Sequence, residues 1–178
     1  EQVENKYVTI EQLNKLGWSD ITDEQVEDLN YSLKKYDITT PERIRHFLSQ
    51  CSHESGLGIW TQELASGDDY EYREDLGNIY QGDGPRYKGA GYIQLTGRSN
   101  YQRFADEMSD PKIMDGVDYV SKNYPWSSAG SWWNANGMNQ IIDSGASVKQ
   151  VTRRVNGGYN GLAEREKYYQ RSEELFGN

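Results

Sequence analysis

The sequence contains a single cysteine, Cys51, among its 178 residues. No disulfide can therefore form within the chain, and we expect a protein that folds in a reducing place or needs no covalent cross-link. No apolar run is long enough to cross a membrane, and no signal peptide is visible. The chain begins at Glu1 rather than at methionine, from which we expect a processed product or a piece of a longer protein.

Basic residues are few: the chain has 19 Lys and Arg and 28 Asp and Glu, which gives a net charge of −9 and a pI near 4.8. No basic patch stands out, which argues against nucleic acid as a partner. The same charge works against docking from outside onto a polyanionic cell wall.

Phenylalanine is also scarce, with 3 residues against 14 Tyr and 5 Trp. Tyr and Trp join an apolar face to a polar tip and suit surfaces that bind other molecules, including the C–H faces of sugar rings. We expect most of them in the core, with Trp126, Trp132 and Trp133 more typical of core than of a sugar platform. The tyrosines that flank the motifs described below are better candidates for a cleft: Tyr70, Tyr72, Tyr80 and Tyr92.

The first third of the chain predicts helices with clear start signals. Thr9 begins one that stops at Gly17, and Thr22 with Asp23 begins the next. Thr39 and Glu42 have capping-box spacing, with Pro41 between them, and begin a helix that runs past a buried Cys51. Further helices are expected at about 99–108, 127–136, 147–155 and 161–176, the last one largely solvated.

Residues 56–91 lose helical periodicity and are rich in Gly, Asp, Asn and Tyr, which predicts turns and short strands. The fold class expected is therefore α+β, mostly helical, with a small β region between two helical parts. We expect one domain over residues 1–178.

No metal or cofactor is expected. His46 and His53 lie seven residues apart on one predicted helix with no cysteine pair to complete a zinc site. Asp68, Asp69 and Asp83 lack the spacing of a calcium loop. The Gly89-Ala90-Gly91 run is not a nucleotide fingerprint, because strand-like residues 92–95 follow it where a helix should begin.

Two carboxylates could carry chemistry. Glu54 ends an amphipathic helix just before glycines, where partial burial would keep a carboxyl group protonated, as a general acid needs. Glu63 follows nine residues later, and the two can share a site only if Gly56 and Gly58 break the helix between them. Spacing alone does not select Glu63 over its competitors, which are Asp68, Asp69, Glu71 and Glu74.

Three segments in order resemble glycoside hydrolase family 19, which includes chitinases and phage-type endolysins. They read ITTPERIRHFLSQCSHESG (38–56), RYKGAGYIQLTGRSNY (86–101) and RRVNGGYNGLAEREKYY (153–169). The similarity runs from about Ile38 to Tyr169, and three motifs in order are far more specific than one. It implies a lysozyme-like fold with a small β region beside a catalytic cleft.

The resemblance also implies roles. Glu54 matches a general acid, Glu63 a general base that activates water, and Thr96 a hydroxyl residue that holds that water. Arg165 matches an arginine that pairs with the base. His53, Gln94, Asn100 and Asn156 match positions that bind sugar. Arg165 and Tyr92 are also expected to contact sugar, Tyr92 because it flanks the motifs. The family inverts anomeric configuration, which agrees with carboxylates about 6.5–9.5 Å apart.

One position departs from the resemblance: Ala90 stands where the family usually has arginine. Unless Lys88 or Arg86 replaces it, a cation is missing near the cleft. A missing cation there would weaken the activity or change the substrate preference. It also supports an alternative, a catalytically weak sugar-binding module.

The resemblance also bears on the substrate and on where the protein acts. The compact chain, without a disulfide, looks more like the bacterial and phage lysozymes of the family than like plant chitinases, which favours peptidoglycan, with chitin as the alternative. A lytic transglycosylase is a third alternative, which Glu63 disfavours. We expect a monomer that acts in the bacterial periplasm or cell wall, as a phage endolysin or a delivered antibacterial effector with an immunity protein as a partner.

Overall fold

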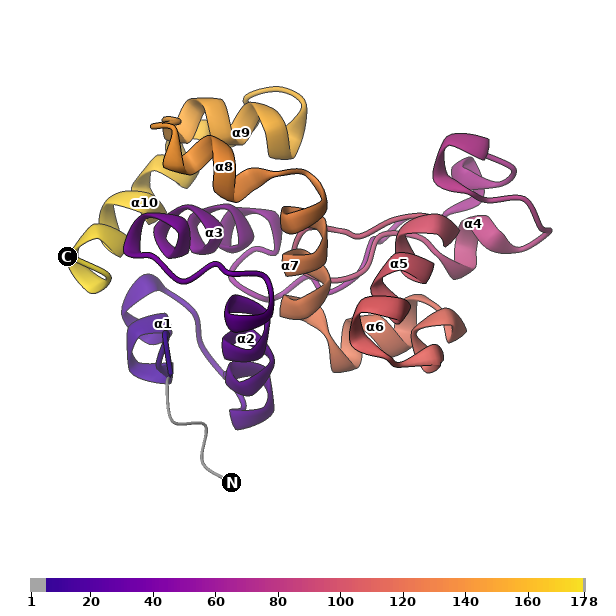
Figure 1. Cartoon of the computed structure of the whole chain (residues 1–178), viewed down its shortest axis with the longest axis horizontal. Helices are drawn as coiled ribbons and strands as arrows, with labels where there is room; N and C mark the ends of the chain where they lie inside the picture. Colours follow the sequence, from indigo (N-terminus) through magenta and orange to yellow (C-terminus); the bar gives the residue numbers. More distant parts are fainter. Residues whose placement is uncertain (1–5, 178) are drawn as a thin grey trace.

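The computed structural model describes residues 6–177. Figure 1 shows a larger group of helices (α1, α2, α3, α8, α9 and α10) and a smaller group (α4, α5 and α6), with α7 between them. The α-helices are α1 Ile10–Leu16, α2 Asp23–Lys35, α3 Pro41–Glu54, α4 Asp83–Arg86, α5 Arg98–Met108, α6 Val117–Asn123, α7 Pro125–Ala135, α8 Met138–Asp143, α9 Val148–Asn156 and α10 Leu162–Leu175. Short 3-10 helices lie at Asp68–Tyr70, Glu74–Leu76 and Pro111–Asp115.

The helix starts follow local capping chemistry. The predicted helix starts at Thr9 and Thr22 are confirmed, and each threonine also forms a full capping box with the glutamine three residues on. The expected capping box of Thr39 and Glu42 is wrong: the cap of α3 is Thr40, whose hydroxyl accepts from the N–H of Arg43. The reason is Pro41, which occupies the first helical position and makes the residue just before it the cap.

The four later helices that the sequence predicted are confirmed to within about two residues at each end. Three short helices, α4, α6 and α8, were not predicted. The last helix is less solvated than expected, because α10 packs along α3 and buries Arg165, Tyr168 and Ser172.

The β region is smaller than expected. Among the described residues it consists of two isolated antiparallel bridges, which join Gln62 to Ala90 and Ala90 to Leu95. The strand expected at residues 92–95 is wrong: this stretch is a turn closed by mutual backbone hydrogen bonds between Ala90 and Leu95. Gly91 and Gln94 take positive φ angles of 81° and 60°, which an extended strand does not allow.

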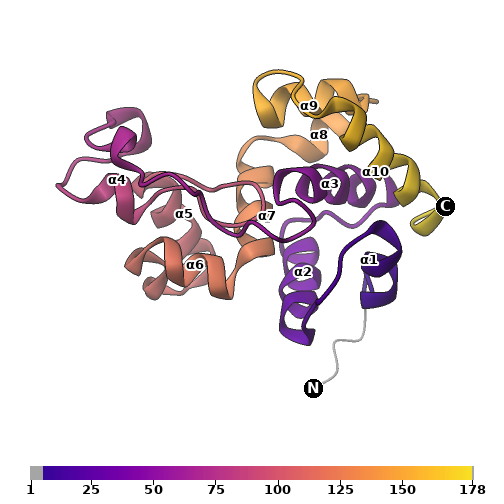
Figure 2. The same ribbon diagram turned by 180° about the vertical axis from the view of Figure 1, so that it is seen from behind.

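The phosphate-loop interpretation of residues 89–91 still fails, because α5 begins only at Arg98. Figure 2 shows the segments on either side of these bridges running next to one another between the two helical groups.

Two hydrophobic clusters form the core. The larger one lies among α1, α2, α3 and α7 and contains Trp126 and Trp133, both almost fully buried, as predicted for core residues. The smaller one surrounds α5 and contains Tyr101 and Phe104. The partly buried Trp132 packs against both clusters. Each helical group therefore has its own apolar centre, and the crossing segments connect them.

Cys51 is fully buried, as expected, and burial raises the pKa of its thiol. No helix within residues 6–177 has the length and apolar character that a membrane span requires. Across the same residues, no three His, Cys, Asp or Glu side chains gather in a way that could hold a metal ion.

Candidate active site

Glu54 is the last residue of α3, where the sequence placed it. The helix stops because Gly56, Leu57 and Gly58 all take positive φ angles. Gly58 is also needed for space, since a Cβ atom there would lie 2.5 Å from the Trp18 ring. The Glu54 side chain keeps 22% of its surface exposed, so its carboxylate is held by the protein yet open to a ligand.

Arg165 holds this carboxylate. Its buried guanidinium donates from Nη2 to Glu54 Oε1 at 2.7 Å, from Nη1 to Gln50 Oε1 at 2.6 Å, and from Nε to the carbonyl oxygen of Asn160 at 3.0 Å. Within the described residues Glu54 Oε2 accepts no hydrogen bond, so this oxygen is the one available to a substrate.

The expected pairing of Arg165 with the base Glu63 is wrong, because its ion pair is with Glu54. The physical reason is the packing of α10 along α3, which brings the first turns of α10 against the last turn of α3. Gln50, which sequence reasoning missed, lies one helical turn before Glu54 and so shares its face of α3.

Glu63 lies in the segment that follows, beside the Gln62–Ala90 bridge. Its carboxylate accepts from the hydroxyl of Tyr70, at 2.8 and 3.0 Å to the two oxygens, and from the N–H of Gly89 at 3.1 Å. All these partners are neutral donors. Burial, and then the hydrogen bond to Glu63, raise the pKa of Tyr70, so the tyrosine stays a donor. Glu63 is partly exposed and oriented as an acceptor.

The segment from residue 89 to residue 100 forms one chain of hydrogen bonds. The Gln94 side chain donates to the Gly91 carbonyl at 2.8 Å, and the Thr96 hydroxyl donates to the Gln94 carbonyl at 2.7 Å. Asn100 in turn donates to the Thr96 carbonyl at 2.7 Å.

Gly89 connects this chain to Glu63. A Cβ atom on Gly89 would lie 2.5 Å from Gln94 Oε1, so the Gln94 side chain lies against the backbone that binds Glu63. The structure thus brings Gln94 next to the Glu63 segment, whereas no hydrogen bond joins Thr96 or Asn100 to Glu63.

His53 and Asn156 lie on the Glu54 side. His53 Nδ1 is 2.7 Å from Glu164 Oε1, and a Cβ atom on Gly161 would lie 2.0 Å from the imidazole ring. Asn156 is exposed, and its side-chain oxygen accepts from the N–H of Asn160 at 3.3 Å. The loop between α9 and α10 therefore runs from Asn156 through Asn160 to the guanidinium that holds Glu54.

The expected sugar contact of Tyr92 is wrong. Its side chain is 2% exposed and packs edge-on against Trp18 and Trp126, with ring centroids 5.2 and 4.7 Å apart. The ring is part of the larger core cluster because the turn at residues 91–94 points it inward. Of the other aromatic candidates, Tyr72 and Tyr80 are each 59% exposed.

Trp60 is an exposed aromatic that sequence reasoning missed. Its ring lies against Gly56, and 48% of its surface is exposed. It stands between the two carboxylates in sequence, which is the signal that could have identified it. An exposed indole in the segment that joins Glu54 to Glu63 is suited to stack on a sugar ring.

Ala90 is fully buried in the smaller core cluster, so the position of the missing arginine faces the protein interior. Lys88 extends instead to the carbonyl oxygen of Ala65, at 2.9 Å, and Arg86 is exposed. The N–H and the carbonyl oxygen of Ala90 both form hydrogen bonds with the backbone of Leu95. Ala90 therefore closes the turn that lies next to the segment of Glu63.

The two carboxylates have complementary surroundings. Glu54 has one oxygen held by a buried cation and one unbound oxygen, while Glu63 accepts only from neutral donors. Glycoside hydrolysis needs two carboxyl groups in different environments, one to protonate the leaving oxygen and one to act on water or on the sugar.

Comparisons with known proteins point the same way. The chain is 29% identical over 158 residues to a Haemophilus influenzae protein named for its glycosyl hydrolase family 19 domain, covering 69% of this chain and 74% of that protein. It is 31% identical over 130 residues to an endochitinase of Arabidopsis thaliana, covering 71% of this chain. The chain spans only 44% of the length of that plant relative.

The solved structure of a bacterial family 19 chitinase superposes with a TM-score of 0.76 at 18% identity, over 96% of this chain and 95% of that one. This likeness confirms the predicted fold class. No protein-family model matches the chain.

Proposed function

We propose a function from the premise that the chain belongs to glycoside hydrolase family 19. The protein hydrolyses β-1,4 glycosidic bonds between N-acetylhexosamine units, with Glu54 as the proton donor and Glu63 as the base. The observation that supports this proposal is that Glu54 and Glu63 have unlike partners, Arg165 for Glu54 and Tyr70 with Gly89 for Glu63. The choice of Glu54 as the acid and Glu63 as the base follows from the resemblance of their segments to those of the family.

In the proposed reaction, Glu54 gives its proton through the unbound Oε2 to the leaving glycosidic oxygen. Glu63 takes a proton from a water molecule that attacks the anomeric carbon from the opposite face. The C–O bond to the leaving sugar breaks as the bond to the water oxygen forms, and the configuration inverts. Thr96 is proposed to hold this water, and His53, Gln94, Asn100 and Asn156 to bind sugar.

We propose the glycan strand of peptidoglycan as the substrate. Support comes from the compact chain and from its lack of an internal disulfide, features that resemble lysozymes of the family. Chitin is the second candidate, and the name of the plant relative, an endochitinase, favours it. Both polymers offer the β-1,4-linked N-acetylglucosamine that the proposed reaction requires.

The net charge of −9 leads us to propose action from the periplasmic side, as a phage endolysin or as a delivered antibacterial effector. An enzyme that attacks a polyanionic wall from outside would benefit from a basic surface. Adding surface lysines should then improve binding to intact Gram-positive walls. If it does not, the argument from charge fails.

The test of function is product analysis by mass spectrometry after incubation with purified sacculi and, separately, with chitin oligomers. New reducing ends from sacculi, absent with Glu54→Gln and with Glu63→Gln, support a muramidase-type hydrolase. Cleavage of chitin alone keeps the mechanism and moves the substrate to chitin. Products with 1,6-anhydro ends would identify a transglycosylase, and binding without products from either polymer would leave a sugar-binding module.

A further inference from the structure

A basic pocket lies beside the loop that reaches the proposed active site. It has a volume of about 520 Å³, within the range of roughly 300–1,000 Å³ common for ligand sites. Its cations are Lys149, Arg153 and Arg154, all exposed on α9, and no Asp or Glu lines it. Ile141 and Ala146 contribute apolar surface.

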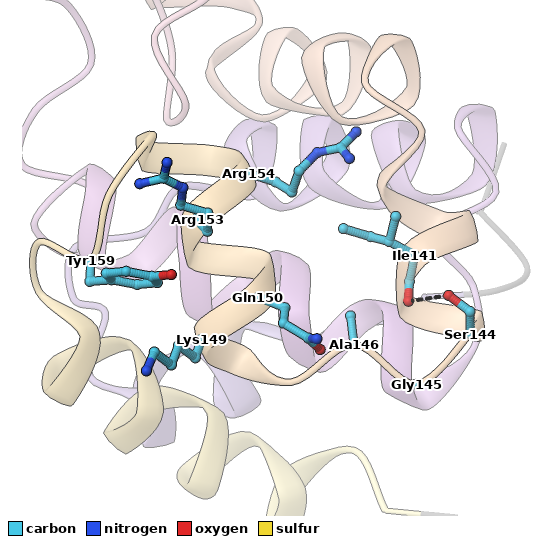
Figure 3. Close-up of a pocket in the computed structure, with 9 residues that line it drawn as sticks. All are labelled: Ile141, Ser144, Gly145, Ala146, Lys149, Gln150, Arg153, Arg154 and Tyr159. Atoms are coloured by element: carbon cyan, nitrogen blue, oxygen red, sulfur yellow. Dashed lines mark hydrogen bonds between the residues drawn. The ribbon is translucent and has the colours of Figure 1, made fainter.

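Figure 3 shows the Tyr159 ring next to Lys149 and Arg153, while Arg154 leaves α9 on the side of Ile141. The Lys149 ammonium lies 5.2 Å, and the Arg153 guanidinium 5.8 Å, from the ring centroid. These cation–π contacts hold two positive charges around one exposed aromatic ring.

The cations of the pocket are not neutralised. Within residues 6–177 no carboxylate lies within ion-pair distance of Lys149, Arg153 or Arg154, although six other arginines of the chain form ion pairs. Arg154 donates to the carbonyl oxygen of Asn136 at 3.0 Å, so it is held in place with its charge uncompensated. On a chain with a net charge of −9, such a cluster favours an anionic ligand.

The pocket is linked to the proposed active site through one short loop. Tyr159 is followed by Asn160, whose carbonyl oxygen accepts from the Arg165 guanidinium that holds Glu54. Asn156, the last residue of α9, bonds to the same Asn160. The pocket and the arginine that holds Glu54 therefore share the loop that runs from Asn156 to Asn160.

We propose that this pocket binds the carboxylate groups of the acidic peptides that peptidoglycan carries on its glycan strand. The inference rests on the proposed function and deepens it by selecting the substrate. Chitin is uncharged and offers nothing to Lys149 and Arg153. A peptide with carboxylates and short apolar side chains matches both the cations and the surface of Ile141 and Ala146.

The test uses the double variant Lys149→Gln/Arg153→Gln. The control Lys34→Gln/Lys122→Gln removes two exposed charges from other helices, α2 and α6, and so matches the change in net charge. Binding is measured by co-sedimentation in a Glu54→Gln background, which separates binding from turnover. The probes are sacculi stripped of phosphate polymers, before and after an amidase removes the peptides.

We expect the pocket variant to bind intact sacculi about tenfold more weakly than the control, an effect that shrinks as salt is raised. The two variants should bind peptide-free strands equally. An equal loss on both probes, or no loss on intact sacculi, would overturn the proposal. A chain that cleaves neither polymer but shows this pattern of binding would refute the proposed reaction and leave the peptide site intact.

Discussion

Arg165 should be required for folding as well as for activity. Its guanidinium is 1% exposed and makes three hydrogen bonds of 2.6–3.0 Å, one of them to Glu54. Replacing it leaves the buried Gln50 oxygen without a donor and the Glu54 carboxyl group without its partner, and breaking a buried pair in this way costs about 3–5 kcal/mol. Glu54 keeps 22% exposure, so water can reach it, and we take the lower end, about 3 kcal/mol, for Arg165→Gln.

At about 2–4 °C per kcal/mol for a chain of this size, Arg165→Gln should unfold about 6–12 °C below the wild type. In Arg165→Lys the charge is kept, but one ammonium group cannot bond to Glu54, Gln50 and Asn160 together. Its unfolding temperature should therefore lie between those of Arg165→Gln and the wild type. Arg73→Gln is the control, because Arg73 pairs with Asp75 on the surface, and its unfolding temperature should be unchanged.

The assay is thermal unfolding followed by circular dichroism at neutral pH, with kcat/KM measured well below the lower transition. Arg165→Gln should also lose most of its turnover while folded, because nothing then fixes the Glu54 carboxylate. An Arg165→Gln protein that unfolds at the wild-type temperature would refute the reasoning.

Three further outcomes are expected. The hydrogen bond from Arg98 lowers the pKa of Asp83 below its ordinary value of 3.8. The pair therefore stabilises the fold at pH values above 3.8, and this stability is lost as the pH falls through the lower pKa of the folded state. In a series of unfolding measurements at decreasing pH, Asp83→Asn should not show this loss. Gly161→Ala should displace the His53 ring, because its Cβ would lie 2.0 Å away at a φ of 72°, and should reduce kcat/KM at least tenfold in steady-state assays. Ala90→Arg should destabilise the fold by about 3 kcal/mol or more in denaturant unfolding and leave turnover no higher, because the position is fully buried; a gain in turnover would contradict this.

Local chemistry explains what the sequence could predict. Thr9 and Thr22 cap their helices by bonding to a glutamine three residues further along the chain, so the pattern is visible in the sequence. Glu54 was placed at a helix end by the same logic, because glycines follow it directly. These features depend on neighbours within one helical turn.

The failures concern contacts between distant segments and unusual backbone. The pairing of Arg165 with Glu54 joins residues 111 positions apart and depends on how α10 packs on α3. The turn at residues 91–94 has the composition of a strand, but the positive φ of Gln94 is not visible in its residue type. The same turn points Tyr92 inward, so this tyrosine, which was expected to contact sugar, packs in the core instead.

In the proposed reaction Glu54 and Glu63 act as acid and base on opposite faces of the sugar. The most direct test follows the anomeric protons of the freshly formed reducing end by NMR, before mutarotation, on whichever polymer the protein cleaves. The α anomer should appear first, since water attacks a β-linked sugar from the opposite face. Initial formation of the β anomer would contradict it, because retention requires a covalent intermediate, or an equivalent double displacement, rather than a base-activated water.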